Sequence, residues 1–141
     1  MNAYDSSSTF AQLPQVPPPC DLTLGLSLVE KDVGRTKWKM LADERFANPA
    51  GVIQGGFLSA MIDSAMGASV ITFVEDRKVF ATNTDLTVRF LRPGRVGSQL
   101  YCEATVVSGG KTVAFVEAKV TDEEERLVAL GSSTYLLLER R

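Results

Sequence analysis

The stretch NPAGVIQGGFLSAMIDSAMG, residues 48–67, decides how this chain folds. From Gly55 to Phe73, apolar residues cover nearly every face of a helix, which predicts a long helix surrounded by protein. Two glycines open this run, and Asp63 is its single carboxylate. Aspartate is a poor helix former and a buried carboxylate costs free energy, so Asp63 calls for a functional explanation.

Segments with the period of β-strands lie on both sides of this helix. Before it, the leucines of residues 22–28 alternate with small or polar residues, and Thr36–Met40 alternates in the same way. After it, the pattern predicts four more strands, at roughly 79–92, 97–107, 112–121 and 126–138. Between these strands, SGGK (108–111) predicts a tight hairpin turn of residues that tolerate positive φ, and DEEE (122–125) predicts a solvated turn.

A lone buried helix needs a cover on every side, and one strongly curved sheet can supply it. The order of the segments therefore predicts an α+β fold, with a curved antiparallel sheet of about six strands wrapped around one long central helix. Trp38 and Phe90 are expected in the core. Residues 1–21, rich in Ser and Pro, are expected to be a flexible segment with STFAQL (8–13) as a candidate short helix, and residues 22–141 to form a single domain.

Composition and charge exclude several classes of function. The net charge of −2 argues against nucleic acid as the main partner, and no stretch approaches the ~20 apolar residues of a membrane span. The N-terminus does not resemble a secretory signal, and Cys20 and Cys102 make neither a disulfide framework nor a metal set, so we expect a cytoplasmic protein. The chain has no histidine, which removes the usual catalytic triads and the commonest zinc ligand. Any chemistry must come from carboxylates, amides, hydroxyls and backbone groups.

The residues around the helix start resemble the signature of the hotdog-fold acyl-CoA thioesterases, especially the phenylacetate-pathway (PaaI-like) type. That signature is Asn, then six residues later His-Gly-Gly at the start of the central helix, then Asp or Glu nine residues after the His. Asn48, Gln54-Gly55-Gly56 and Asp63 have this spacing, and DLTVRFLRPG (85–94) resembles the family's third strand and following turn. The chain departs from the family in having Gln54 where the histidine usually stands.

The resemblance covers about residues 22–138 and carries several implications. It implies a hotdog fold and hydrolysis of an acyl- or aryl-CoA thioester. Coenzyme A is then part of the substrate, and no separate cofactor or metal is required. It also implies a homodimer with shared sites, with two dimers expected to pair into a tetramer.

Gly55 and Gly56 stand where a ligand could approach the backbone closely. The free N–H groups of a helix N-terminus point outward at the positive end of the helix dipole, which suits an oxyanion developing on a thioester carbonyl. The resemblance implies that the Gly56 N–H polarises that carbonyl and that Gly55 lies against the substrate. Simple close packing at the helix start is the alternative.

Asp63 shares its helix face with a stripe of small residues that could admit a ligand or a second helix (Gly56, Ser59, Ala60 and Gly67). The resemblance implies that Asp63 is the nucleophile or the general base, and the sequence leaves both open. An aspartate on a solvent-facing edge, or one bonded to a neighbouring strand, is the alternative. Gly56 and Asp63 are seven residues apart, which places them roughly 10 Å apart along the axis. One carboxylate can hardly reach a carbonyl held at the start of its own helix. We therefore predict composite sites between antiparallel helices of a two-fold dimer, and an inactive monomer.

Three amides complete the candidate catalytic set. The resemblance implies that Asn48 donates to the thioester oxygen or orients water, although an Asn before Pro49 also suits a loop cap. Gln54 can replace the family histidine as a hydrogen-bonding group but cannot transfer a proton. Asn83 falls where relatives carry a Ser or Thr that assists the water, and it is equally an ordinary strand residue.

Basic residues and the second glycine pair are candidates for contacts to coenzyme A. Arg92 and Lys111 carry charges that suit its phosphates, as does Arg89, and solvated surface charge is the alternative for each. Gly109 and Gly110 could present backbone N–H groups to the pantetheine or the phosphates. A non-catalytic acyl-CoA-binding module remains the alternative function, favoured by Gln54 and opposed by the joint presence of Asn48, Gly56 and Asp63.

Overall fold

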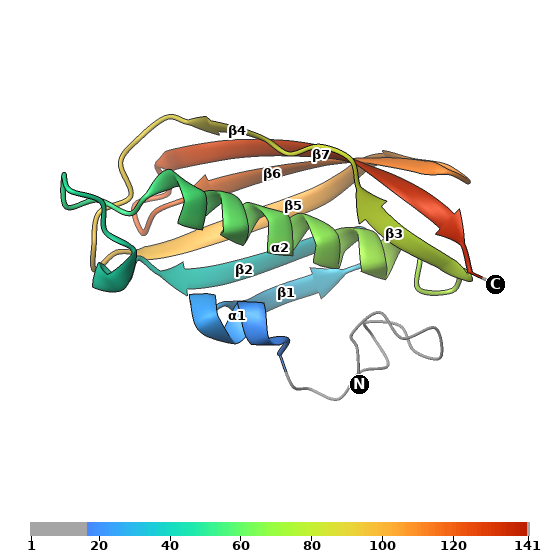
Figure 1. Cartoon of the computed structure of the whole chain (residues 1–141), viewed down its shortest axis with the longest axis horizontal. Coiled ribbons are helices and arrows are strands. Elements are labelled where there is room, and N and C mark those ends of the chain that lie inside the picture. Colours follow the sequence, from blue (N-terminus) through green and yellow to red (C-terminus); the bar gives the residue numbers. More distant parts are fainter. Residues whose placement is uncertain (1–16, 141) are drawn as a thin grey trace.

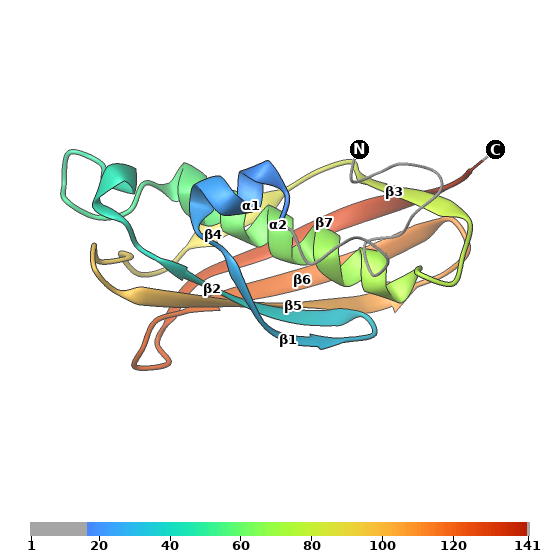
Figure 2. The ribbon, with the colours of Figure 1, turned by 90° about the horizontal axis from the view of Figure 1, so that it is seen from below.

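One long helix lies across the concave face of a curved antiparallel sheet (Figures 1 and 2). The computed structural model describes residues 17–140. The helices are α1 (Pro19–Leu24), the 3-10 turn η2 (Glu44–Phe46) and α2 (Gly55–Phe73). The strands are β1 (Ser27–Asp32), β2 (Arg35–Leu41), β3 (Val79–Asn83), β4 (Thr87–Phe90), β5 (Gln99–Gly109), β6 (Val113–Thr121) and β7 (Leu127–Glu139). The predicted α+β hotdog architecture is confirmed.

The sheet has the strand order β1-β2-β5-β6-β7-β3, and β4 also pairs with β7. The predicted strand 79–92 is divided at Asp85, so the sheet has seven strands rather than about six. The backbone N–H of Thr134 donates to the Asp85 carboxylate (2.8 Å), and the hydroxyl of Ser133 donates to the Asp85 carbonyl (2.7 Å). Asp85 therefore takes over the contacts to β7 where the strand is interrupted.

The core lies between α2 and the inner face of the sheet. The helix buries large apolar side chains (Leu58, Met61, Ile62, Met66 and Val70) against alternate residues of the central strands (Met40, Leu100, Val116, Val120 and Val128), with Trp38 buried as predicted. Helix and sheet are in close contact at Gly131, where an added Cβ would lie 2.5 Å from Cγ2 of Ile62. By length and composition alone α2 could cross a membrane, but its packing on the sheet is that of a core helix.

The strand predicted from the leucines of residues 22–28 is wrong, because its first part is the helix α1. Proline is favoured in the first turn of a helix, and Gly25 ends α1 in the left-handed conformation (φ 73°). Leu24 packs inward while Leu22 is exposed. Leucines at every second position over so few residues fit either structure, and the flanking Pro and Gly were the better signal. STFAQL lies outside the described residues.

Both predicted turns are present, but the glycines of the 108–111 turn act differently from the prediction. Neither Gly109 nor Gly110 has a positive φ. An added Cβ at Gly109 would lie 2.6 Å from the Phe73 ring, so glycine is needed there for close packing. In the 122–125 turn, the Asp122 carboxylate accepts the backbone N–H groups of Glu124 and Arg126.

Candidate active site

The start of α2 is an uncapped helix N-terminus. Gln54 is the N-cap residue, yet its side chain accepts none of the helix N–H groups, and the first turn has no acidic residue. Within residues 17–140, the N–H groups of Gly55 and Gly56 donate to no other residue. A Cβ built on Gly56 would meet nothing within 4 Å. Gly56 therefore presents an accessible N–H at the positive end of the helix dipole, as predicted for a group that polarises a carbonyl.

Gly55 has the close-packing role that the sequence left open as the alternative. A Cβ at this position would lie 2.7 Å from the Phe90 ring of β4, so glycine allows the ring to lie over the helix start. Phe90 itself is 54% exposed, which corrects the prediction that it belongs to the core. The two glycines thus face different surroundings, since Gly55 faces Phe90 and Gly56 faces open space.

Asp63 is exposed on the outer side of α2, which corrects the expectation that it is buried. The sheet covers only the inner side of the helix, so the stripe that runs from Gly56 through Asp63 to Gly67 is left open or half open by the rest of the chain. The side-chain amide of Asn83, at the end of β3, donates to Asp63 Oδ1 at 2.9 Å. The structure therefore brings together two of the predicted catalytic residues from α2 and β3.

Asp63 and Asn83 line a cleft of about 380 Å³ beside the outer side of α2. Its walls come from α1, α2, β3 and β7, and include Asp21, Ser64, Gly67, Ile71, Phe80 and Tyr135. Ligand pockets are typically about 300–1,000 Å³ in volume, so the cleft is large enough for the acyl part of a thioester. No group of three or more His, Cys, Asp or Glu side chains within residues 17–140 is arranged to hold a metal ion.

Gly56 does not line this cleft, although it lies on the same side of the helix. Seven residues of helix separate it from Asp63, a distance of roughly 10 Å along the axis. A single chain therefore holds the acid and the uncapped N–H as two separate half-sites.

The remaining amides lie near the start of α2. The side-chain oxygen of Asn48, Oδ1, accepts the backbone N–H groups of Ala50 (2.9 Å) and Val52 (3.4 Å), which is the loop-capping arrangement. Its NH2 group donates to none of the other described residues. The side chain of Gln54 is exposed, and no hydrogen bond holds it within residues 17–140.

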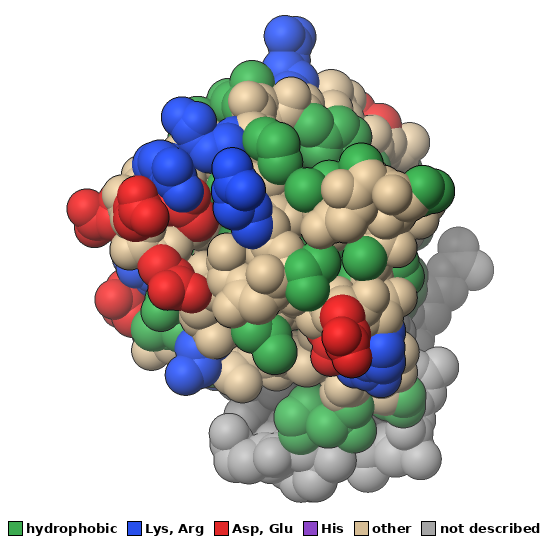
Figure 3. Space-filling view, turned by 90° about the vertical axis from the view of Figure 1, so that its left-hand side faces the viewer, with side chains coloured by type: hydrophobic (Ala, Val, Ile, Leu, Met, Phe, Trp, Pro, Cys, Tyr) green, Lys and Arg blue, Asp and Glu red, His purple; other side chains and the backbone are tan. Residues whose placement is uncertain are grey.

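A second, smaller hollow of about 150 Å³ lies near the start of α2 and is rich in arginine. Arg92, Arg95 and Arg126 line it together with Asp122. Arg126 is paired with Asp122 (2.9 Å), whereas Arg92 and Arg95 form no ion pair with the described residues. The backbone of Arg95 also forms an isolated β-bridge with Val52, just before the start of α2. Figure 3 views this end of the molecule, where basic side chains gather beside acidic ones.

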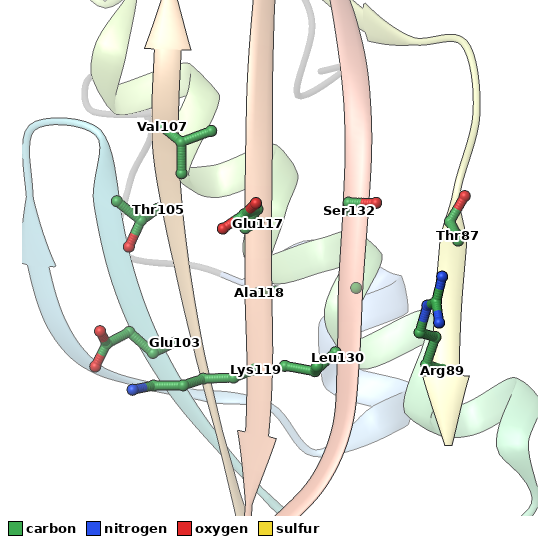
Figure 4. A pocket seen from close by; sticks show the side chains of 11 residues that line it. Thr87, Arg89, Glu103, Thr105, Val107, Glu117, Ala118, Lys119, Leu130 and Ser132 are labelled. Carbon is green, nitrogen blue, oxygen red and sulfur yellow. The ribbon is translucent and has the colours of Figure 1, made fainter. Parts of the chain in front are cut away.

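The other predicted coenzyme A contacts lie elsewhere in the chain. Gly109, Gly110 and Lys111 lie at the opposite end of α2, where the Arg77 guanidinium donates to the carbonyls of Gly110 (2.9 Å) and Lys111 (2.7 Å). Arg89 lines a shallow hollow of about 430 Å³ on the face of the sheet turned away from α2, and none of the predicted catalytic residues lines this hollow (Figure 4).

Comparison with known proteins identifies the family of the chain. Residues 50–129 match the thioesterase superfamily. The chain belongs to this family. As a member of this family, the chain is a thioester hydrolase. The matched range includes Gly56, Asp63 and Asn83.

Individual relatives span most of the chain. Human acyl-coenzyme A thioesterase 13 is 24% identical over 110 residues, 77% of each protein. The PaaI acyl-coenzyme A thioesterase of Escherichia coli is 25% identical over 111 residues, 79% of this chain and 76% of that protein. Its structure superposes with a TM-score of 0.80 over 86% of this chain and 85% of that chain. A Streptococcus mutans protein solved with bound acetyl-CoA, 19% identical, has the same fold (TM-score 0.79, covering 92% and 98%).

Two features of this thioesterase-superfamily member escaped the sequence reasoning. Asp21 lines the cleft from α1, in a segment expected to be flexible, and the Pro-rich composition hid the short helix. Arg95 and Arg126 join Arg92 only because two loops meet in space, and no spacing in the sequence indicates that meeting.

Proposed function

We propose that the protein hydrolyses an acyl- or aryl-CoA thioester to the free acid and coenzyme A, at two composite sites of a homodimer. The observation that carries this proposal is the Asp63 carboxylate, held by Asn83 at the mouth of a cleft of about 380 Å³. An exposed aspartate in the middle of a helix, bonded to a strand amide beside an acyl-sized cleft, suits an acid that must reach a reacting carbon.

In the proposed reaction the thioester oxygen accepts a hydrogen bond from the Gly56 N–H of one subunit. Asp63 of the other subunit either takes a proton from the attacking water or attacks the carbonyl itself. Asn83 keeps the carboxylate oriented. Asn48 contributes through its NH2 group alone, because its carbonyl oxygen is engaged in the loop.

Unpaired sheet edges and the open face of α2 support a dimer in which the two half-sites meet. Within residues 17–140, no strand pairs with the outer edge of β3 or β4. Exposed apolar side chains gather along this edge and beyond it (Leu86, Phe90 and Leu91). Antiparallel packing of two copies along this edge would bring Asp63 of each toward Gly56 of the other. It would also cover the small-residue stripe.

The arginine hollow suits the phosphates of coenzyme A. Among residues 17–140, Arg92 and Arg95 have no carboxylate partner, and Arg95 is tied to the loop that leads into α2. Unpaired guanidinium groups bind phosphate oxygens through charge-assisted hydrogen bonds. A thioester whose carbonyl binds at Gly56 would then have the nucleotide of its coenzyme A at the same end of the molecule.

The first test is thiol release from a panel of acyl- and aryl-CoA esters. We expect Asp63→Ala and Asp63→Asn to lower kcat by at least about 100-fold, as expected for loss of a general base or nucleophile. Asp76→Asn, an exposed acid beyond the end of α2, is the matched control and should retain activity. Equal thiol release by the Asp63 variants and the parent protein would refute the assignment. Tight coenzyme A binding without any hydrolysis would favour the non-catalytic binding module.

Mixing variants tests the composite site directly. Gly56→Pro removes the proposed donor without breaking an intrahelical hydrogen bond, since this N–H has no acceptor in the helix. Neither Gly56→Pro nor Asp63→Ala should be active alone. After subunit exchange, half of the dimers are mixed and each has one intact site of two, so about one quarter of the parent activity should return. No recovery after proven exchange would contradict composite sites.

A further inference from the structure

Asp21 is a buried carboxylate that the proposed reaction does not use. It lies on α1, is 5% exposed, and lines the same cleft as Asp63. Its neighbours are the Cys20 thiol, with Sγ 3.7 Å from Oδ1, and the hydroxyl of Ser64. No Lys or Arg of residues 17–140 pairs with it, and burial raises the pKa of the carboxyl above its usual value.

This arrangement costs folding free energy, because buried carboxylates are normally paired with a cation or with several hydrogen bonds. Within residues 17–140, only the Ser64 hydroxyl and the Cys20 thiol, a weak donor, bond the Asp21 carboxylate, which has about four lone-pair sites. Gly25 ends α1, and the Leu26 N–H bonds to the backbone carbonyl of Asp21 rather than to its side chain. The apolar contact of α1 with the core comes from Leu24. The fold therefore leaves part of the acceptor capacity of the Asp21 carboxylate unused.

The position of Asp21 relates it to the acyl group. Ser64, which hydrogen-bonds the Asp21 carboxylate, directly follows Asp63 in α2. Consider an acyl chain whose thioester carbonyl lies at Asp63 and whose tail extends into the cleft. That tail passes between α2 and β3, along Ile71 and Phe80. These walls are apolar, and Asp21 places a negative charge beside them. A substrate that fills the cleft with hydrocarbon alone would leave that charge desolvated and without a cation.

We propose that Asp21 is a specificity-determining residue that selects acyl groups carrying a hydrogen-bond donor, either a hydroxyl or an ammonium group, within the part of the chain that enters the cleft. The proposal rests on the proposed thioesterase function, since it assumes that the cleft beside Asp63 receives the acyl group. A donor on the acyl group would bond the acceptor sites of the carboxylate that Ser64 and Cys20 leave free. A site built to bond a substrate donor discriminates against the analogue that lacks it.

The test compares esters of one chain length that differ in the position of the donor. Octanoyl-CoA, its 3-, 6- and 8-hydroxy forms, and its 6- and 8-ammonio forms are assayed for kcat/KM. For at least one position we expect a preference over octanoyl-CoA of about 10- to 100-fold, as for a hydrogen bond to a charged group. Asp21→Leu should reduce this ratio to about one or below. Asp21→Asn, which keeps an acceptor but no charge, should keep most of a hydroxyl preference and lose an ammonium preference.

Leu24→Ala is the control for damage to α1, since it loosens the docking of the helix and keeps the carboxylate. It should lower hydrolysis of all the esters by a similar factor and leave the preference ratio unchanged. No preference at any position, or a preference that survives Asp21→Leu, would overturn the proposal. If no ester is hydrolysed, the proposed function fails. The same ratios are then measured as binding affinities for the esters by titration calorimetry, and they decide the role of Asp21 independently.

Discussion

Adding one methyl group at Gly56 separates a catalytic role of the helix start from a purely structural one. A Cβ at Gly56 meets no atom within 4 Å, so Gly56→Ala introduces no clash in the chain. Replacing Gly by Ala at a compatible helical position stabilises a protein by about 0.4–1 kcal/mol, chiefly by restricting the unfolded chain. For a protein of this size we expect the melting temperature to rise by about 1–3 °C.

Activity should change in the opposite direction. A helical Cβ is tilted toward the N-terminus, so the new methyl lies beside the N–H that the thioester oxygen must approach to about 2.7–3.1 Å. Loss of one oxyanion donor lowers kcat by about 10²–10³-fold. Since the methyl obstructs the N–H without removing it, we expect a fall in kcat/KM of roughly 10- to 100-fold.

Gly55→Ala is the matched control, one residue away on the same helix turn. Its Cβ would lie 2.7 Å from the end of the Phe90 ring, which is more than half exposed and can turn aside. Moving the ring costs about 0.5–1.5 kcal/mol and offsets the gain from alanine, so the stability should stay near that of the parent. Its kcat/KM should stay within a few-fold, because this Cβ points toward Phe90.

The assay is thiol release under steady-state conditions, with melting temperature and sedimentation measured on the same preparations. Sedimentation confirms that each variant keeps the assembly of the parent. The reasoning is refuted if Gly56→Ala forms the parent assembly and hydrolyses every ester within about two-fold of the parent rate. The glycine would then serve only the geometry of the helix start.

Other substitutions test the remaining parts of the site. Asn83→Ala should lower kcat by about 10-fold with little change in KM, because Asp63 loses the hydrogen bond that orients it. Arg92→Glu should raise KM for acyl-CoA esters by about 10-fold but leave acyl-N-acetylcysteamine esters unaffected, and equal effects on both would exclude phosphate binding. Asp21→Asn should raise the melting temperature at pH 7. The raised pKa of Asp21 means that the folded protein holds its proton more tightly than the unfolded chain, so the gain should disappear as the pH falls below the unfolded pKa near 4. Gln54→His should change kcat less than about three-fold and add no new ionisation near pH 6.5 to the pH–rate profile.

The sequence predicted the central part of the fold best. The helix α2 begins and ends at the predicted residues, Gly55 and Phe73, because nineteen residues of apolar sequence leave few alternatives. The short elements were less predictable. Leucines at every second position suggested a strand where Pro19 and Gly25 bound a helix, and Asp85 interrupts a strand through contacts with β7 that only the folded chain provides.

The candidate site was predictable in its residue types and less so in its surroundings. Helix geometry converts the seven-residue spacing of Gly56 and Asp63 into a distance, and this distance was enough to predict two separate half-sites in one chain. Burial could not be predicted in the same way. Apolar residues around α2 indicated a helix covered on all sides, whereas the sheet of one chain covers only the inner side. The uncovered side carries Asp63, and a second copy is the cover that the composite-site proposal requires.

The surroundings of Gln54 show why the proposed site can work without the histidine that relatives usually have at this position. In the described structure, Gln54 caps no helix N–H with its side chain and hydrogen-bonds neither Asp63 nor Asn83. The acid receives its orientation from Asn83, and the N–H of Gly56 is available without help from position 54. A glutamine there can still donate a hydrogen bond to a bound thioester, which is a positional task. In the proposed reaction Asp63, as general base or as nucleophile, is the one titratable group placed at the reaction centre. The proposed chemistry therefore needs no histidine, and the proposed selection of the acyl group depends on the cleft and on Asp21.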